Sequence, residues 1–285
     1  MEPPESISEE LPSYEESTQS ILSPVKSLNI QGETPAQTII SKAEDLTHYM
    51  ESLVMENHLP SCNVPEKIVI ALDIARDENY TYFLGNGDEK IPPFNALVSA
   101  IEMFAKLKQR QSKNHEFGIV LLKQSKAFWD FGFSSDLKQL SCSLKKVLEC
   151  KAVEKFDLTS LFTIIVSKIK TYEFYKDHSI PPPYVVRLVL FYNRSYTIPE
   201  LHLMQNIKEL LNCPYFFVDV LAAHEPVSDK NQCEEIFKRL QNIDTKGYSY
   251  FFNVGRNTSA LIRSVLKLVG HPLQRPLQSL ADYSL

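Results

Sequence analysis

The chain has 285 residues and a hydrophobic content of 44%, which is ordinary for a globular protein and sufficient for one large domain or two small ones. Its formal charge of −5 is unevenly distributed: residues 1–35 contain seven Glu and one Lys, whereas the remainder contains 29 basic and 28 acidic residues. A nearly neutral body without a basic stripe argues against direct binding to nucleic acid and against electrostatic binding to a membrane.

The first 64 residues differ in composition from the rest of the chain. Residues 1–35 are rich in Glu, Ser and Pro and contain few apolar side chains, so we predict a disordered acidic leader. Apolar residues recur at helical spacing between Ile39 and Val54, and residues 36–64 are interpreted as a helix followed by a linker. This helix could pack against the main domain or bind a partner, and the sequence does not decide between the two.

The compartment is inferred from the termini and the cysteines. The N-terminal sequence lacks the basic and apolar regions of a signal peptide, and no apolar run approaches the roughly 20 residues of a membrane span. The five cysteines are scattered without a Cys-x-x-Cys pair, which favours free thiols in a reducing compartment over disulfides or a zinc site. We expect a protein of the cytoplasm and the nucleus.

From residue 65 onward, short apolar segments alternate with amphipathic ones. Six segments are typical of strands: residues 68–72, 116–122, 126–131, 185–192, 215–221 and 248–254. Helices are predicted between and after them, over residues 93–110, 137–148, 158–165, 199–211, 234–240 and 258–269. We expect Asp157 to cap the third of these helices, Pro199 to begin the fourth and Gly270 to end the last.

This alternation of strands and helices predicts an α/β fold with a doubly wound, mostly parallel six-stranded sheet. Residues 126–131 follow the second strand after a short turn, so we expect them to form the one antiparallel edge strand. Residues 185–192 are the most apolar segment and are placed at the centre of the sheet. The short connections indicate a single domain over residues 65–270.

The first strand ends in Asp73, which is followed by Ala75 and Asp77 at alternate positions. Ligands of open α/β sheets are held at the carboxyl ends of the strands. The spacing is similar to the Asp-x-Ser-x-Ser motif with which von Willebrand A domains bind a divalent ion through oxygen ligands. Here Ala75 has no ligand atom, Asp77 replaces a neutral hydroxyl, and Asn193 follows the fourth strand where such domains usually have Asp.

We therefore predict that Asp73, Ala75, Asp77 and Asn193 form a degenerate site that holds no metal, and we expect no other cofactor. Thr159 is the nearest hydroxyl at the start of the third helix. Asp73 is expected instead to accept hydrogen bonds from the loop backbone, or to pair with Arg76 or Arg194.

Candidate catalytic side chains do not form a known pattern. His224 follows the fifth strand and could share the sheet edge with Asp73, but a lone His at a strand end more often hydrogen-bonds its own loop. Cys213 lies at the opposite end of the same strand. The chain contains no Gly-x-Ser-x-Gly motif and no phosphate-binding loop, so we predict that it is not an enzyme.

Five sequence blocks in matching order carry a resemblance to a known family. They are residues 65–70 (PEKIVI), 180–187 (IPPPYVVR), 213–220 (CPYFFVDV), 244–247 (DTKG) and 271–276 (HPLQRP). With these blocks, residues 64–285 closely resemble the von Willebrand A-like scaffold subunits of the BRISC deubiquitinase assembly. The first 60 residues do not share the resemblance.

The resemblance implies a von Willebrand A-like fold and a non-catalytic scaffold subunit. Such a subunit docks on a partner with ubiquitin-conjugating-enzyme-like (UEV) domains. Through this partner it joins a metalloprotease-type deubiquitinase and its pseudo-enzyme partner, which act on non-degradative ubiquitin chains. A sister complex of the family acts in DNA repair. The alternative that remains open is an ion-dependent von Willebrand A-type protein-binding domain outside the ubiquitin system.

Residues 271–285 follow the last predicted helix and are interpreted as an extended partner-binding tail. Two prolines around one arginine reduce the entropy that an extended ligand loses on binding, and arginine supplies a bidentate donor. The residues expected to contact the partner are Pro272, Leu273, Gln274, Arg275, Pro276 and Tyr283.

Overall fold

A six-stranded sheet runs through the computed structural model, which describes residues 59–85, 87, 89–169, 181–244 and 246–281. The strands are β1 (Glu66–Asp73), β5 (Glu116–Leu122), β6 (Ala127–Ser134), β9 (Val185–Tyr192), β11 (Phe216–Ala223) and β12 (Phe251–Val254). Their order is β12-β11-β9-β1-β5-β6, and all neighbours are parallel except β5 and β6. The predicted antiparallel edge strand and the central position of residues 185–192 are therefore confirmed.

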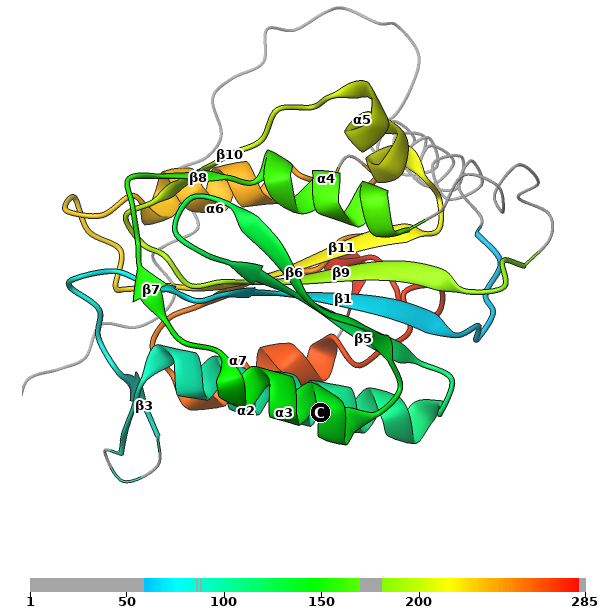
Figure 1. Cartoon of the computed structure of the whole chain (residues 1–285), viewed down its shortest axis with the longest axis horizontal. Helices are drawn as coiled ribbons and strands as arrows, with labels where there is room; N and C mark the ends of the chain where they lie inside the picture. The colour runs from blue at the N-terminus through cyan, green and yellow to red at the C-terminus, as the bar shows by residue number, and fades with distance from the viewer. Residues whose placement is uncertain (1–58, 86, 88, 170–180, 245, 282–285) are drawn as a thin grey trace, which may run out of the picture. The chain divides into compact units, whose positions relative to one another are not determined.

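Helices cover both faces of the sheet, as Figure 1 shows. One face carries α2 (Pro93–Gln111), α3 (Leu137–Lys146) and α7 (Thr258–Lys267). The other face carries α4 (Thr159–Lys168), α5 (Gln205–Asn212) and α6 (Cys233–Gln241). The predicted doubly wound α/β fold is confirmed. Among the described residues, no helix combines the length and the apolar character that crossing a membrane requires.

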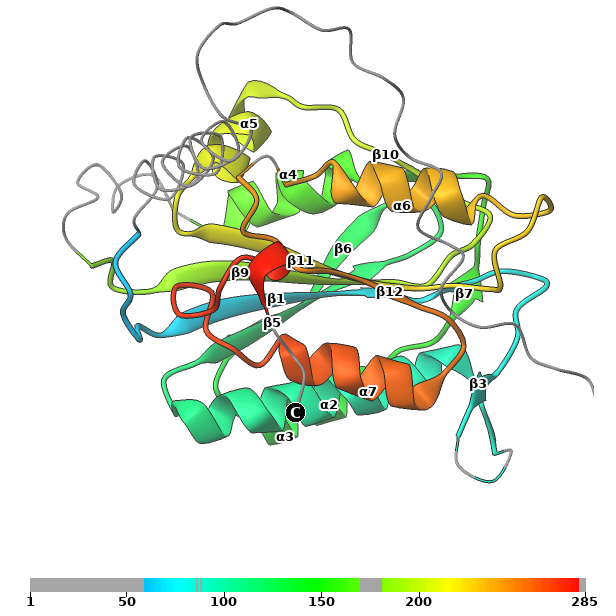
Figure 2. The same ribbon diagram turned by 180° about the vertical axis from the view of Figure 1, so that it is seen from behind.

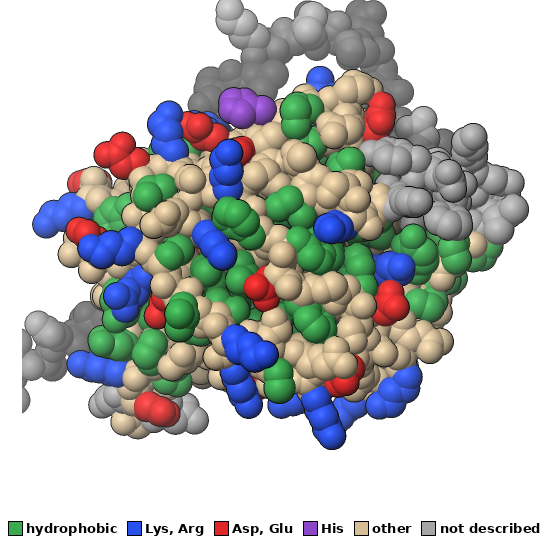
Figure 3. All heavy atoms as spheres, viewed as in Figure 1, with side chains coloured by type: hydrophobic (Ala, Val, Ile, Leu, Met, Phe, Trp, Pro, Cys, Tyr) green, Lys and Arg blue, Asp and Glu red, His purple; other side chains and the backbone are tan. Residues whose placement is uncertain are grey.

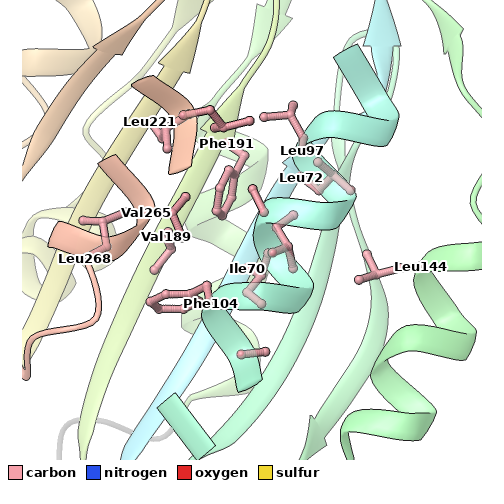
Figure 4. Packing of buried hydrophobic residues seen from close by; sticks show 14 of the residues in the cluster. Ile70, Leu72, Leu97, Phe104, Leu144, Val189, Phe191, Leu221, Val265 and Leu268 are labelled. Carbon is pink, nitrogen blue, oxygen red and sulfur yellow. The ribbon is translucent and has the colours of Figure 1, made fainter. Parts of the chain in front are cut away.

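Each central strand contributes side chains to both cores, because successive residues of a strand point to opposite faces. On one side Ile70 and Leu72 of β1 pack with Leu97 and Phe104 of α2 (Figure 4), and all four are buried. On the other side Val69 belongs to the core under α4, α5 and α6. Full burial of such a side chain contributes roughly 1.5–3 kcal/mol, so the unbroken apolar pattern of these strands is explained by helices on both faces.

Two predicted helix starts are wrong. Pro199 lies in a short strand, β10 (Ile198–Glu200), which pairs with β8 (Lys155–Asp157), and α5 begins only at Gln205. Asp157 lies in β8, and its side chain does not cap α4, whose N-cap residue is Leu158. The pairing of these two short strands uses Asp157, which was predicted as a helix cap, and residues 199 and 200, which were predicted as the start of a helix.

Gly270 does not have the predicted capping role. The C-cap residue of α7 is Leu268, and Gly270 is not among the glycines with a positive φ. The chain after α7 instead forms a turn at residues 272–274 and a 3₁₀ helix, η2 (Gln278–Leu280). Residues 271–281 are therefore folded, which corrects the prediction of an extended tail over this part of the segment.

Short pairings also order the loops at the carboxyl end of the sheet. β2 (Ala75–Arg76) runs parallel to β7 (Cys150–Lys151), and β3 (Phe83–Leu84) forms a hairpin with β4 (Lys90–Ile91). The first of these pairings fixes the chain directly after Asp73 and so positions the predicted metal-site residues.

Candidate functional site

The carboxyl end of β1 places Asp73 at the middle of the sheet edge, beside Asn193 and Arg194, which follow β9. Asp73 Oδ1 accepts a hydrogen bond from the N–H of Ala75 (3.2 Å), and Oδ2 accepts one from the N–H of Asn193 (3.0 Å). Arg194 Nε lies 3.0 Å from Oδ1 and 3.1 Å from Oδ2, and neither of these two side chains has exposed surface. Of the partners that the sequence offered, Asp73 thus uses the loop backbone and Arg194.

Further contacts hold the guanidinium of Arg194 in this place. Nη1 donates to the carbonyl of Gln124 (2.5 Å) and Nη2 to the carbonyl of Lys123, both in the turn after β5. The guanidinium carbon also lies 4.5 Å from the centre of the Phe156 ring. A guanidinium presents its donors in a rigid plane, so these partners fix its orientation. A divalent ion at Asp73 would have to displace this cation.

The other predicted ligand atoms also have partners within the protein. Asp77 Oδ2 accepts a hydrogen bond from the N–H of Ser195 (2.7 Å), and Asn193 Oδ1 accepts one from Arg256 (2.7 Å). Thr159 Oγ1 accepts one from the N–H of residue 202 (2.9 Å). With no donor atom at position 75 and a guanidinium on Asp73, these residues do not fit a hard divalent ion such as Mg²⁺, which requires near-octahedral oxygen ligands.

Burial shifts the pKa values of the carboxyl groups of Asp73 and Asp77. It raises the pKa of Asp77 to about 6, and the N–H of Ser195 opposes this rise. It also raises the pKa of Asp73, against the charge of Arg194 and the two backbone N–H groups. Within the described ranges, no group of three or more His, Cys, Asp and Glu side chains is arranged to hold a metal ion.

The structure does not bring His224 and Cys213 together, because they lie beyond opposite ends of β11. His224 Nδ1 lies 2.6 Å from the carbonyl of Glu225, and its ring packs edge-on against Phe237 with the ring centres 4.6 Å apart. Burial lowers the pKa of His224 and raises the pKa of the Cys213 thiol. Both shifts favour the neutral forms of these groups.

A second polar site, which the sequence analysis missed, lies at the amino ends of the central strands. Arg187, inside β9, donates from Nε to Asp219 of β11 (2.7 Å) and from Nη1 to Glu66 of β1 (3.3 Å). It also donates to the carbonyls of Leu268 (2.7 Å) and Gly270 (3.2 Å), directly after α7. All three charged side chains are completely buried, and cations are favourable at a helix C-terminus.

A lysine from α2 completes the charges around Glu66. Lys108 Nζ is buried and donates to Glu66 Oε1 and to the carbonyl of Val269 (3.1 Å). Burial alone would raise the pKa of Glu66, but the charges of Arg187 and Lys108 lower it. Burial lowers the pKa of the neighbouring His115 to about 4, so this imidazole is neutral and accepts the N–H of Glu66 at Nδ1 (3.0 Å).

The segment after α7 supplies the third cation of this site, and Figure 2 shows this segment in red beside β11. Arg275 binds Asp219 with both terminal nitrogens, at 2.9 Å and 2.6 Å, and donates to the carbonyl of Tyr248 at 3.0 Å. Its guanidinium carbon lies 4.0 Å from the centre of the Tyr250 ring. Burial alone would raise the pKa of Asp219, and the charges of Arg275 and Arg187 lower it.

Arg275 therefore has a structural role, and the prediction that it projects toward a partner is wrong. Its side chain is only 5% exposed, and Leu273 is 8% exposed and packs with Val185 and Tyr215. Pro272 is also buried, whereas Gln274 and Pro276 are exposed. Tyr283 lies outside the described residues. A signal was present in the sequence: Asp219 and Arg187 are charges inside strands that are otherwise apolar, and buried charges need partners.

We expect that Mg²⁺ and Mn²⁺ do not stabilise the protein, because the guanidinium of Arg194 already uses both oxygens of Asp73. An ion that bound only the folded state would raise the unfolding free energy, by about 2.7 kcal/mol at a concentration 100 times its Kd. Thermal unfolding with and without the metals measures this. Sub-millimolar binding in calorimetry that Asp73→Ala removes would contradict the expectation.

Replacing Arg194 by Met should lower the free energy of unfolding by about 3–5 kcal/mol, because it leaves the carboxylate of Asp73 buried without a cation. Urea denaturation at neutral pH measures the change. The double variant Asp73→Asn, Arg194→Met should recover part of the loss, since it removes the unpaired charge as well. Equal losses in the single and the double variant would show that the charge pair is not the cause.

Arg275→Ala should lower the free energy of unfolding by at least about 2 kcal/mol, because Asp219 loses a bidentate partner inside the protein. Gln274→Ala is the matched control, and as a change at an exposed neighbour it should stay within about 0.5 kcal/mol of the natural protein. If both variants unfold at the same urea concentration as the natural protein, the segment after α7 does not hold the sheet in solution.

Comparison with known proteins identifies the family. A scan against protein-family models finds no match. The chain is 37% identical over 229 residues to "BRISC and BRCA1-A complex member 1" of Xenopus laevis, covering 79% of this chain and 69% of the relative. The protein of the same name from Homo sapiens is 36% identical over 231 residues, with 79% and 70% covered.

Among solved structures, the chain is similar to the SpRpn10 VWA domain with a TM-score of 0.46 and 10% identity, covering 75% of this chain and 99% of that domain. The sequence relatives show the family, because their identity exceeds one third and extends over most of both chains. The chain belongs to the family of BRISC and BRCA1-A complex member 1.

Proposed function

We propose that this chain is a non-catalytic scaffold subunit of a deubiquitinase assembly that acts on non-degradative ubiquitin chains. The observation that carries the proposal is the 36–37% identity, over 79% of the chain, to relatives named as members of the BRISC and BRCA1-A complexes. Homologous chains with the same fold commonly keep the same place in an assembly, so we infer that this chain is a subunit of such a complex.

The contacts within the domain support a structural role for the polar residues at the sheet edge. Asp73 is paired with Arg194, Asp77 accepts the N–H of Ser195, and His224 contacts the backbone of its own loop. A catalytic base or nucleophile needs a reacting partner within hydrogen-bonding reach. Here the hydrogen bonds of these groups go to other groups of the same domain, which favours a scaffold over an enzyme.

The proposed assembly has several protein partners and two locations. The chain docks on a subunit with UEV domains and, through it, joins a metalloprotease-type deubiquitinase and the pseudo-enzyme partner of that deubiquitinase. It acts in the cytoplasm and the nucleus, without direct contact to nucleic acid or membrane. If the segment after α7 contributes to docking, its exposed side chains Gln274, Pro276 and Leu280 are available, whereas Leu273 and Arg275 are not.

The ion-dependent alternative is less well supported by the geometry. Adhesion-type binding requires an ion with an open coordination position for a ligand from the partner. Asp73 instead holds the guanidinium of Arg194, and position 75 has no donor atom. We therefore infer that partners contact the domain directly and not through a shared metal ion.

Purification of the tagged full-length chain from its own cells should recover a UEV-domain subunit and a metalloprotease-type deubiquitinase, identified by mass spectrometry. The recovered assembly should cut non-degradative ubiquitin chains, and the chain made alone in bacteria should leave them intact. Recovery without any ubiquitin-processing subunit, or cleavage by the chain made alone, would contradict the proposal. A tagged Arg194→Met variant, assayed below its melting temperature, tests whether the Asp73–Arg194 pair at the sheet edge matters for assembly.

A further inference from the structure

A surface hollow of about 400 Å³ lies where α3 ends beside the carboxyl ends of β1 and β5. We name it the α3 groove and define it by Ile74, Leu121, Lys123, Lys146, Val147 and Leu148. Ile74 and Leu121 are buried and form an apolar floor. Pockets of about 300–1,000 Å³ accommodate ligands of the size of a few side chains. The groove is thus large enough for one or two bulky residues of a peptide.

One exposed apolar side chain lines the groove, and a second lies against Lys123 at its rim. Leu148 directly follows the C-cap residue of α3 and is 84% exposed, and Phe128 of β6 is 48% exposed. Phe128 pairs with Leu121 in the antiparallel ladder, so both side chains lie on the face of the sheet that carries α3. A large apolar side chain that remains exposed beside a surface hollow is a common sign of a binding surface.

The charges at the rim are mainly positive. Lys123 and Lys146 line the groove, and Lys145 is exposed in the same last turn of α3. The carboxylate of Asp130 also lines the groove and accepts a hydrogen bond from the hydroxyl of Ser143 (2.8 Å), so two lysines face one carboxylate among the lining residues. Figure 3 shows Lys and Arg side chains gathered over the lower helix layer of this face, with hydrophobic side chains among them. This surface is complementary to an acidic ligand.

The neighbouring edge of the sheet favours an extended ligand. Among the described residues β6 is an edge strand that pairs with β5, and it lies at the front of the view in Figure 1. An extended peptide beside such a strand presents alternate side chains to the same face. Apolar side chains of the peptide would then enter the groove while the acidic ones between them lie toward the lysines at the rim.

We propose that the α3 groove binds an extended acidic segment of a partner protein. One bulky apolar side chain of the segment fills the hollow between Phe128 and Leu148, and flanking carboxylates pair with Lys123 and Lys146. Charged contacts at the rim speed association and set specificity, and the buried apolar side chain supplies most of the affinity. The proposal concerns a surface of this domain and does not depend on which assembly the chain joins.

The test uses the full-length chain and a fluorescein-labelled nonapeptide of alternating Glu and Leu, with the same peptide carrying Gln in place of Glu as the uncharged probe. Fluorescence anisotropy measures both Kd values. We expect the Gln peptide to bind at least about tenfold more weakly, which corresponds to about 1.4 kcal/mol. Higher salt should weaken binding of the Glu peptide, because the rim charges are exposed.

Variants locate the peptide on the protein. Lys123→Glu and Lys146→Glu should each raise the Kd of the Glu peptide about tenfold, and Leu148→Ser about fivefold, with unchanged circular dichroism. The matched controls are Lys208→Glu and Leu203→Ser, at exposed positions in and before α5 on the opposite face. They should leave the Kd within about twofold, since the two surfaces are separated by the sheet.

Three results of the binding experiments would overturn the proposal. They are equal affinity for the two peptides, equal effects of the groove variants and the control variants, and no detectable binding at millimolar peptide. A dimer of the chain in light scattering that Leu148→Ser dissociates would also overturn it, because the occupant of the groove would then be a second copy of this chain.

Discussion

Buried carboxylates at both ends of the central strands are neutralised by two arginines of β9 and the residues after it. Arg187 binds Asp219 and Glu66 at the amino ends, and Arg194 binds Asp73 at the carboxyl end. Removing such charges from water is costly, and an unpaired one destabilises a fold strongly. Because β9 lies between β1 and β11, the pairs at the amino end form only when all three strands are in the observed register. A slip by one residue would turn Arg187 to the other face of the sheet.

The need to neutralise buried carboxylates also connects the end of the described chain to the sheet. Asp219 accepts from Arg187 on one side and from Arg275 on the other, so the segment after α7 completes the neutralisation of a strand residue. Tyr250 adds a hydrogen bond to the carbonyl of Pro276 (2.6 Å). The side chain of Gln278 exchanges two hydrogen bonds with the backbone of residue 251 in the edge strand β12 (2.8 Å and 2.9 Å). In this way a segment with no helical or strand periodicity becomes part of the domain.

The fold could be predicted from the sequence because apolar runs such as residues 185–192 mark strands that are covered on both faces. The pairing of Asp73 with Arg194 was also within reach, since a charge at a strand end needs a partner close by. The structural role of Arg275 could not be predicted from its local sequence. The prolines around it suit an extended ligand and a folded turn equally well, and its partner lies 56 residues earlier in the chain. The start of α5 was missed for a similar reason, because β10 depends on pairing with the distant β8.

The pairing of Asp73 with Arg194 also affects the surface beside it. The guanidinium that pairs with Asp73 donates to the backbone carbonyls of Gln124 and Lys123, so it orders the turn that carries the Lys123 side chain. The amine of this side chain lies 4.9 Å from the centre of the Phe128 ring, at the rim of the α3 groove. A surface whose backbone is fixed before binding loses less entropy when a partner docks. Arg194 therefore occupies both carboxylate oxygens of Asp73 at the sheet edge and at the same time binds the backbone of the adjacent turn, which carries Lys123.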